Sequence, residues 1–230
     1  MGVAAAVLVA GLAGCGGATR TVTVATTPTA PPPAPGTAAA AAAGGGREDG
    51  IAVHGERASA RYRPATGCGI ERWAVKTLTY PGASRVNHRP KASSIAALTA
   101  LPAPIDPTDR IAPTETTVWR ITVTMTAFKE EDDSDIHLTV KDSRGRTMIV
   151  EFPLTPTCDA TASQPDRAAM SQARAAFVAA CGQPRTSYRS VSGQATITGV
   201  GFFDRMHGQR GVAPNGIELH PVLAFSGTCD

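Results

Sequence analysis

Imidazole and carboxylate side chains are the groups in this 230-residue chain whose types suit chemistry. Such groups act as general acids and bases and bind divalent metal ions. We assign no catalytic residue from the sequence; the candidates are His137, Glu151, His207 and His220. Three of these are also the candidate metal ligands, namely His137, Glu151 and His220.

Two of the candidates are brought together by strand register. Residues 136–141 alternate apolar and polar side chains, and Met148, Val150 and Phe152 form the inward face of the next strand, which predicts two half-buried strands. Matching their apolar faces requires Leu138 opposite Val150, with a three-residue turn at 143–145. This register places His137 opposite Glu151 on the outer face, where the carboxylate would raise the pKa of the imidazole. A structural cross-strand pair is the alternative interpretation.

The elements around this pair predict the fold. Strands are expected at 119–126, 136–141, 148–152, 195–203 and from Ile217 to Leu223. A helix begins after Ser163 and ends at Gly182, between the third and fourth strands. The order predicts a mainly β (α+β) fold, a five-stranded OB-like Greek-key barrel with one helix. An antiparallel sandwich is the rival, for which too few strands are visible.

An N-terminal extension is expected to pack on the barrel. Within it, residues 73–80 are predicted as a strand and residues 94–101 as a short helix ended by Pro102. Gly199 and Gly201 in the fourth strand indicate a bulge or a close backbone approach.

The outer face of strands two and three, with the loops after strands one and four, is the usual ligand surface of an OB-fold. The residues expected to border it, and hence the candidate ligand-binding residues, are Lys129, Asp135, His137, Glu151, Asp204 and His207. The first of the two loops is acidic from Glu130 to Asp135, and we interpret it as a solvated turn. Its charge, the small net charge of +3 and 5% aromatic residues argue against a nucleic-acid partner.

The N-terminus carries an export signal. Residues 1–15 are apolar and small, and Leu12-Ala13-Gly14-Cys15 matches the bacterial lipobox, which predicts lipidation of Cys15. No Lys or Arg precedes the apolar run, and a cleaved signal that releases the protein is the alternative. Residues 16–67 are rich in Thr, Pro, Ala and Gly and predict a disordered tether, which leaves residues 68–230 as a single domain.

Four further cysteines lie in the predicted domain: Cys68, Cys158, Cys181 and Cys229. An even number in an exported protein predicts disulfides. We expect Cys158–Cys181, because these two flank the helical connection, and therefore Cys68–Cys229. A zinc site is the alternative, but the spacing contains no pair separated by two residues.

Three stretches resemble an uncharacterised family of exported bacterial lipoproteins. They are Glu71–Leu78, Lys129–Val140 and, above all, the long motif from Gly199 to Leu223. The resemblance covers about residues 68–225 and implies secretion and a compact β domain. It implies no activity.

These observations predict a cell-surface lipoprotein that presents an OB-like binding or structural domain. Its expected partners are the membrane, through the lipid anchor, and an extracellular ligand that the sequence does not identify. We expect no cofactor and favour a protein that is not an enzyme. The alternative is a secreted metal-dependent hydrolase that uses the outer-face His/Glu cluster.

Overall fold

The computed structural model describes residues 47–48, 51–52, 68–69, 71–105 and 109–230. The description below concerns the described residues of the unit Ala42–Asp230. Cys15 lies outside the described residues, as does most of the predicted tether. Two short strands, β1 (Arg47–Glu48) and β2 (Ile51–Ala52), form an antiparallel pair within the segment for which we expected no secondary structure.

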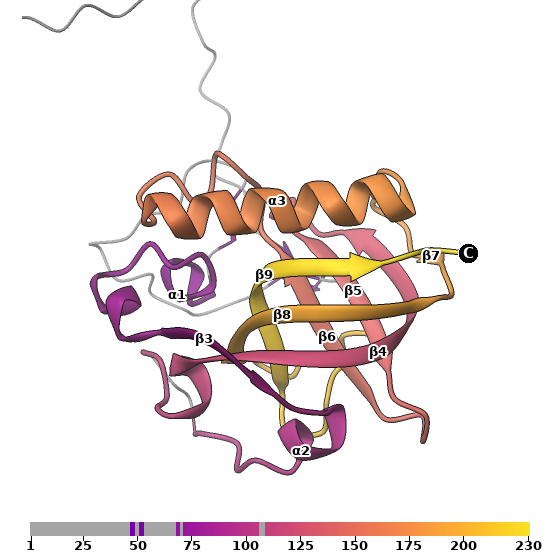
Figure 1. Ribbon diagram of the computed structural model, residues 1–230, viewed down its shortest axis with the longest axis horizontal. Helices are drawn as coiled ribbons and strands as arrows, with labels where there is room; N and C mark the ends of the chain where they lie inside the picture. The colour runs from indigo at the N-terminus through magenta and orange to yellow at the C-terminus, as the bar shows by residue number, and fades with distance from the viewer. Residues whose placement is uncertain (1–46, 49–50, 53–67, 70, 106–108) are drawn as a thin grey trace, which may run out of the picture. The chain divides into compact units, whose positions relative to one another are not determined.

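The domain is a closed five-stranded barrel, as predicted (Figure 1). Its strands are β4 (Thr117–Glu130), β5 (Ile136–Lys141), β6 (Thr147–Phe152), β8 (Gln194–Phe203) and β9 (Ile217–Gly227). They follow the order β4-β5-β6-β9-β8, and β8 pairs with β4 to close the ring. β6 and β9 are parallel and the other neighbours antiparallel. This is the OB-fold arrangement, with α3 (Gln164–Cys181) between the third and fourth barrel strands.

α3 covers one end of the barrel and runs along its upper edge in Figure 1. Ser163 caps the helix by accepting a hydrogen bond from the Asp166 backbone N–H, and Gly182 ends it at φ 85°. Its buried stripe contributes Phe177, whose ring centroid lies 5.0 Å from that of Phe128 and 4.9 Å from that of Phe152. The predicted helix is therefore confirmed.

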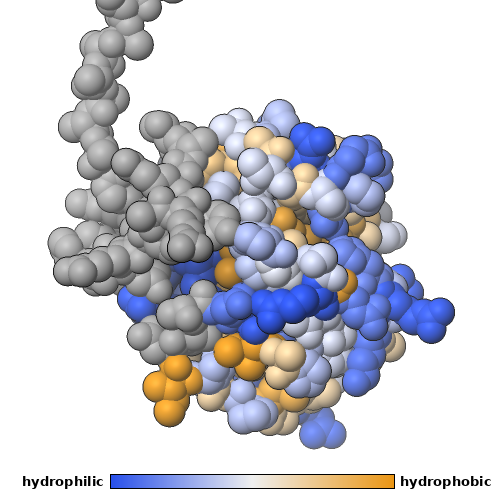
Figure 2. All heavy atoms as spheres, turned by 90° about the vertical axis from the view of Figure 1, so that its left-hand side faces the viewer, coloured by the Kyte–Doolittle hydropathy of each residue, from blue (hydrophilic) through white to orange (hydrophobic). Residues whose placement is uncertain are grey.

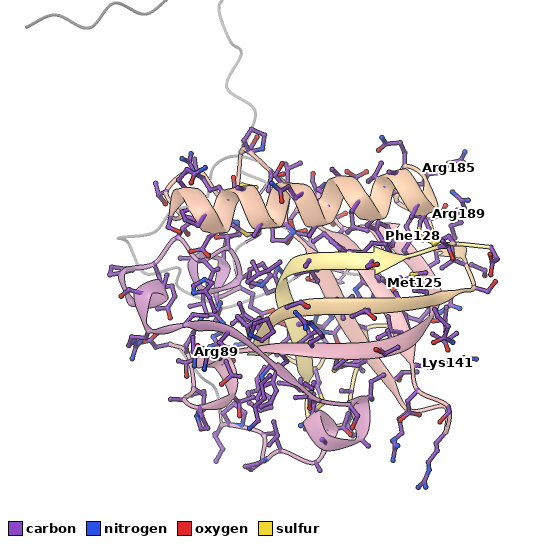
Figure 3. The ribbon with its side chains drawn as sticks, in the orientation of Figure 1. Arg89, Met125, Phe128, Lys141, Arg185 and Arg189 are labelled. Atoms are coloured by element: carbon purple, nitrogen blue, oxygen red, sulfur yellow. A yellow bond between two sulfur atoms is a disulfide. The ribbon has the colours of Figure 1, made fainter. Side chains whose placement is uncertain are left out.

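A short strand, β7 (Arg189–Ser190), pairs with β4 beside the C-terminal end of α3. Figure 3 shows Phe128 and Arg189 close together near the end of α3. The Arg189 guanidinium carbon lies 5.5 Å from the centroid of the Phe128 ring. This contact covers the edge of the core with a charged group that stays in water.

The extension before the barrel differs from the prediction at its start. Residues 73–80 do not form a strand: α1 (Trp73–Lys76) is a single helical turn, followed by the 3-10 turn η1 (Pro81–Arg85). A short apolar run such as residues 73–80 shows no reliable hydrophobic period. The sequence pattern therefore could not distinguish a strand from a helix there. A strand that we did not predict, β3 (Asn87–Ala92), pairs in parallel with β4, and the predicted short helix is present as α2 (Ile95–Thr99).

A buried ion pair fastens the extension to β8. Glu115, in the 3-10 turn η2 (Thr114–Thr116), accepts two hydrogen bonds from the Arg72 guanidinium, at 2.9 and 2.7 Å. Its Oε1 also accepts the Phe203 backbone N–H at 2.7 Å. Arg110 donates to the backbone oxygens of Glu115 and Gly201. The close approach at Gly201 was predicted, and a Cβ there would collide with the Thr114 carbonyl oxygen.

The disulfides are Cys68–Cys158 and Cys181–Cys229, so the predicted pairing is wrong. Cys158 precedes α3 and Cys181 ends it, and an 18-residue helix spans about 27 Å. The helix thereby holds these two cysteines apart. Cys158 bonds Cys68, which precedes the barrel, and Cys181 bonds Cys229 near the C-terminus. Two disulfides are compatible with a location outside the reducing cytoplasm.

None of the helices that the structure describes combines the length and hydropathy required to span a bilayer. In the view of Figure 2, the described surface is mostly hydrophilic, with apolar side chains in small separate patches.

Candidate functional site

The outer faces of β5, β6 and β9 bring two imidazoles and two carboxylates together. The predicted register of β5 and β6 is confirmed: His137 pairs with Glu151, and Leu138 with Val150. The parallel pairing of β6 with β9 sets Ile149 against Glu218 and Val150 against Leu219. Because side chains alternate along a strand, Glu218 and His220 project on the same side as Glu151.

His137 faces two carboxylates with one ring nitrogen. Its Nδ1 lies 3.0 Å from Glu131 Oε1 and 3.1 Å from Glu151 Oε1. Its Nε2 lies 3.0 Å from the backbone oxygen of Arg210. A carbonyl only accepts hydrogen bonds, so Nε2 carries a hydrogen and donates it. This fixes the orientation of the ring, with Nδ1 directed at the carboxylates.

His220 is held by carboxylates at both ring nitrogens. Its Nδ1 lies 2.9 Å from Glu151 Oε2 and 3.2 Å from Glu218 Oε1. Its Nε2 lies 3.1 Å from Asp135 Oδ2. Glu151 therefore stands between the two imidazoles, with one oxygen toward each.

The cluster of Glu131, Asp135, His137, Glu151, Glu218 and His220, called the His/carboxylate cluster below, is buried. His220 is 0% and His137 1% exposed, although we expected an open outer face. The acidic loop also differs from the predicted solvated turn, because Glu131 and Asp135 fold inward at 6% and 4% exposure. Asp135 Oδ1 accepts the Leu154 backbone N–H at 2.8 Å, which anchors the loop to the end of β6.

Two segments from outside these strands cover the cluster. Phe202, on β8, packs its ring against His220 with a centroid separation of 5.8 Å. The Arg72 guanidinium carbon lies 4.5 Å from the Phe202 centroid, so the start of the extension closes over this side. On the other side, the loop between β8 and β9 supplies the Arg210 carbonyl. The usual ligand surface of the fold is thus occupied by the chain itself.

The imidazoles favour their charged forms. Burial alone would lower the pKa of His137, but hydrogen bonds with Glu131 and Glu151 raise that pKa well above its usual value. The pKa of His220 is also raised well above the usual value, because Asp135, Glu151 and Glu218 outweigh the effect of burial. Burial would raise the pKa of Glu151, yet its hydrogen bonds with both imidazoles bring that pKa well below its usual value.

The pKa values of Glu218 and Glu131 are raised, first of all by burial. Burial, together with repulsion from Glu151 and Asp204, raises the pKa of Glu218 to about 8. Burial and the charge of Glu151 also raise the pKa of Glu131, against hydrogen bonds with His137 and Lys129 that lower it. Both carboxylates therefore hold protons more tightly than free Glu.

A cationic rim borders the His137 side of the cluster. Lys129 Nζ lies 2.7 Å from Glu131 Oε2 and 5.2 Å from the centroid of the half-buried Tyr188 ring. The Arg210 guanidinium carbon lies 5.0 Å from the same centroid. The Tyr188 ring in turn makes an edge contact with His137, at 5.8 Å between centroids. Lys129 thus lies beside the cluster, next to His137, as the sequence analysis expected.

Asp204 and His207 belong to a neighbouring group. With Glu71 they form a set of three whose potential ligand atoms lie within 4.8 Å of one another. Asp204 Oδ1 also lies 3.5 Å from Lys76 Nζ. The sequence placed Asp204 and His207 on the ligand surface near His137, whereas the structure gathers them around Glu71 of the extension.

Two sets of residues within the His/carboxylate cluster bring potential metal ligands close together. Each set offers one ligand atom per residue within 4.8 Å, and the sets are Glu131, His137 and Glu151, and Asp135, Glu151 and His220. Comparison of the chain with protein-family models, curated proteins and solved structures gives no match. The chemistry of the site therefore has to be argued from its own geometry.

Sequence reasoning missed Glu131 and Lys76, and did not propose Glu218 as a site residue. Glu218 had a signal, since it lies two residues from His220 on one strand face. Glu131 sits in a loop with no periodic pattern, and Lys76 in the extension whose structure was predicted wrongly.

Proposed function

We propose that this chain is an exported metal-binding protein that holds a divalent transition-metal ion in the wall of its barrel. The ligands are His137 through Nδ1, Glu131 and Glu151. Adjacent ligand atoms around an ion with bonds of about 2.1 Å lie about 3.0 to 3.4 Å apart. The separations of 3.0 and 3.1 Å from His137 Nδ1 to the two carboxylate oxygens fit this spacing.

The observation that carries the proposal is the sharing of one ring nitrogen by two carboxylates. If Nδ1 of His137 is protonated, its single hydrogen has to serve both Glu131 and Glu151. A metal ion at that position binds the nitrogen and both oxygens at full strength. The other ring nitrogen donates to the Arg210 carbonyl. Metal-binding histidines usually have such an orienting acceptor, which fixes the tautomer.

The ligand types indicate the class of metal. One imidazole and two carboxylates suit borderline divalent ions such as Zn²⁺ and Mn²⁺ rather than soft ions. All four cysteines of the described domain are in disulfides, so thiolate ligands are not part of this set. Mg²⁺ prefers oxygen ligands and retained waters, which makes it a useful negative probe.

We favour holding an ion over hydrolysis. A hydrolytic metal site keeps an open coordination position that substrate can reach. The side chains of His137, Glu131 and Glu151 are 1%, 4% and 10% exposed. Burial to this degree supports a site that retains its ion, with capture or storage as the role.

The first prediction concerns metal content. Purified full-length protein incubated with Zn²⁺ and then freed of excess metal is expected to retain zinc, measured by mass spectrometry. Glu131→Gln keeps the shape of the side chain, and His137→Ala removes the nitrogen. Each is expected to weaken Zn²⁺ binding by at least about tenfold, the effect usual for loss of a supporting group, and His137→Ala by more.

A matched control is His88→Ala. His88 Nε2 also contacts a carboxylate, Asp166 Oδ1 at 2.6 Å, but its side chain is 49% exposed. Its removal is expected to leave zinc retention unchanged. Zinc-free wild-type protein after this treatment, with normal circular dichroism, would contradict the proposed function.

We also propose that the protein is anchored to the outer face of the cell membrane by lipid on Cys15. The lipobox, the resemblance to exported lipoproteins and two disulfides support this location. An anchor with two or more acyl chains gives stable attachment.

The second prediction tests this anchor. Cys15→Ser is expected to move the protein from the membrane fraction to the medium, measured by immunoblotting of fractionated cells. Cys229→Ser serves as a control for loss of any cysteine, because it leaves the lipobox intact and should stay with the membrane. Unchanged fractionation of Cys15→Ser would show that Cys15 is not the attachment point.

A further inference from the structure

Each of the two carboxylates proposed as metal ligands presents only one of its oxygens to His137. Glu131 Oε1 and Glu151 Oε1 lie 3.0 and 3.1 Å from His137 Nδ1. The other oxygen of each carboxylate faces a nitrogen of a neighbouring side chain. Glu131 Oε2 lies 2.7 Å from Lys129 Nζ, and Glu151 Oε2 lies 2.9 Å from His220 Nδ1. Both carboxylates are therefore divided in the same way, with one oxygen toward the ion position and one toward a hydrogen-bond donor.

The imidazole of His220 acts as a donor here and not as the ligand of a second ion. Its Nε2 lies 3.1 Å from Asp135 Oδ2, whereas Glu151 lies at its Nδ1. A ring with a carboxylate oxygen at each nitrogen donates a hydrogen from both. Because Asp135 and Glu151 face opposite ring nitrogens, no single ion can bind both carboxylates together with this imidazole.

Glu151 rather than Glu218 receives the hydrogen on Nδ1 of His220. Glu218 Oε1 is the more distant of the two oxygens, at 3.2 Å. Burial, with repulsion from Glu151 and Asp204, raises the pKa of Glu218 to about 8. The Glu218 carboxyl group therefore keeps its proton near neutral pH and is the weaker acceptor. The hydrogen bond from His220 thus occupies Oε2 of Glu151.

Both donors are held in place by contacts outside the ion position. Asp135, at Nε2 of His220, accepts the Leu154 backbone N–H through its other oxygen at 2.8 Å. Lys129 Nζ lies 5.2 Å from the centroid of the Tyr188 ring, which is a cation–π contact. The side chains of His220 and Lys129 are only 0% and 10% exposed. A donor that moved away from its carboxylate would lose a second contact as well, so the second oxygens stay occupied.

The number of carboxylate oxygens that remain for the ion sets the coordination that the protein offers. A carboxylate with one oxygen occupied binds an ion through the other oxygen alone. The protein then supplies three atoms, which are His137 Nδ1 and one oxygen each from Glu131 and Glu151. With one water molecule, three protein ligands give the four-coordinate geometry that Zn²⁺ favours. Mn²⁺ favours six ligands that are mostly oxygen, and it gains from a carboxylate that binds through both oxygens.

We propose that Lys129 and His220 determine the metal specificity of the site, because they restrict Glu131 and Glu151 to one ligand oxygen each and so favour Zn²⁺ over Mn²⁺. This inference rests on the metal-binding function proposed above. It adds which ion is selected and which residues select it. Lys129 and His220 are positioning residues, since each acts on the ion through a carboxylate.

The test compares the Zn²⁺ and Mn²⁺ affinities of the full-length protein, measured by calorimetry. Lys129→Met keeps the length of the side chain and removes the cation from Oε2 of Glu131. It is expected to lower the ratio of Zn²⁺ to Mn²⁺ affinity by at least about tenfold, the effect usual for loss of a group that supports a ligand. A purely structural defect would weaken the binding of both ions and leave their ratio unchanged.

Lys129→Arg is the matched control, because a guanidinium also donates to a carboxylate oxygen. It is expected to keep the wild-type ratio. His220→Phe keeps an aromatic ring beside Phe202 but has no nitrogen, and it is expected to lower the ratio as Lys129→Met does. Circular dichroism checks that each variant is folded. If His220→Phe does not fold, the comparison of Lys129→Met with Lys129→Arg decides the proposal.

Co²⁺ reports the geometry of the site directly, since four-coordinate Co²⁺ absorbs visible light far more strongly than six-coordinate Co²⁺. Wild-type protein and Lys129→Arg loaded with Co²⁺ are expected to show the strong absorption, and Lys129→Met is expected to lose intensity. Weak absorption in the wild type, or an unchanged affinity ratio in Lys129→Met, overturns the proposed specificity and leaves the metal-binding function standing. Wild-type protein that binds neither Zn²⁺ nor Co²⁺ overturns both.

Discussion

Glu115→Ala is expected to lower the free energy of unfolding by about 3 to 5 kcal/mol, the usual cost of removing one partner of a buried ion pair. Glu115 is 0% exposed and accepts two hydrogen bonds from Arg72. It also accepts the backbone N–H groups of Ile111 and Phe203, at 2.6 and 2.7 Å. The substitution leaves a guanidinium and two backbone donors in a site that water cannot easily reach. Urea unfolding followed by circular dichroism measures the loss.

The matched control is a surface ion pair of the same chemistry. Arg85 donates to Asp109 Oδ2 at 2.8 Å, with both side chains more than half exposed. Arg85→Ala is expected to cost far less than Glu115→Ala, because an exposed pair gains little in water. Equal losses for Glu115→Ala and Arg85→Ala would show that the extension is not fastened to β8 by this pair.

The ion pair of Arg72 and Glu115 also explains why the His/carboxylate cluster is covered. Arg72 both binds Glu115 and lies over the Phe202 ring, which packs against His220. The extension therefore stabilises the barrel and covers the His/carboxylate cluster with the same residue. Sequence patterns give no access to this role, because Arg72 meets Glu115 from 43 positions away and lies in a segment without periodicity.

The sequence predicted the barrel because its signals are local. The alternation over 136–141 and the inward face of Met148, Val150 and Phe152 leave a single register that buries both apolar faces, and the pair His137–Glu151 follows from it. The proximity of Glu218 and His220 to Glu151 depends instead on barrel closure, through the parallel pairing of β6 with β9. No periodicity encodes that pairing, so strand register predicted one pair of residues, whereas the structure has a cluster of six.

Burial was the other property beyond the reach of the sequence. An outward face of a barrel is exposed only if nothing covers it, and the cover here comes from the extension and from the loop between β8 and β9. The prediction of the disulfide pairing was wrong for a related reason. Which cysteines meet depends on where α3 lies across the barrel, and its length separates the two that are nearest in sequence.

The last prediction is that the metal-free protein becomes less stable as pH rises from 5 to 9. The pKa of Glu218 is raised to about 8 by burial and by repulsion from Glu151 and Asp204, whereas unfolding returns it to the usual value. The folded state thus binds more protons than the unfolded state. The resulting stabilisation is complete below the pKa of Glu218 in the unfolded chain, and it is lost as the pH rises through the pKa of Glu218 in the folded protein. His137 and His220, with raised pKa values, act in the same direction. The expected loss from Glu218 alone is about 4 kcal/mol.

Urea unfolding in the presence of a chelator at pH 5, 7 and 9 measures this loss. Glu218→Gln has the same shape and no charge, so it should be nearly as stable as wild type at pH 5 and more stable at pH 9. Glu130→Gln is the control, since Glu130 is a half-buried carboxylate at the end of β4 outside the cluster, and it should keep the wild-type slope. Zn²⁺ should flatten the wild-type profile, because an ion replaces protons as the countercharge of these carboxylates. A metal-free stability that stays constant or rises up to pH 9 would mean that the buried carboxylates are already compensated within the protein, and the electrostatic argument for a bound cation would fail with it.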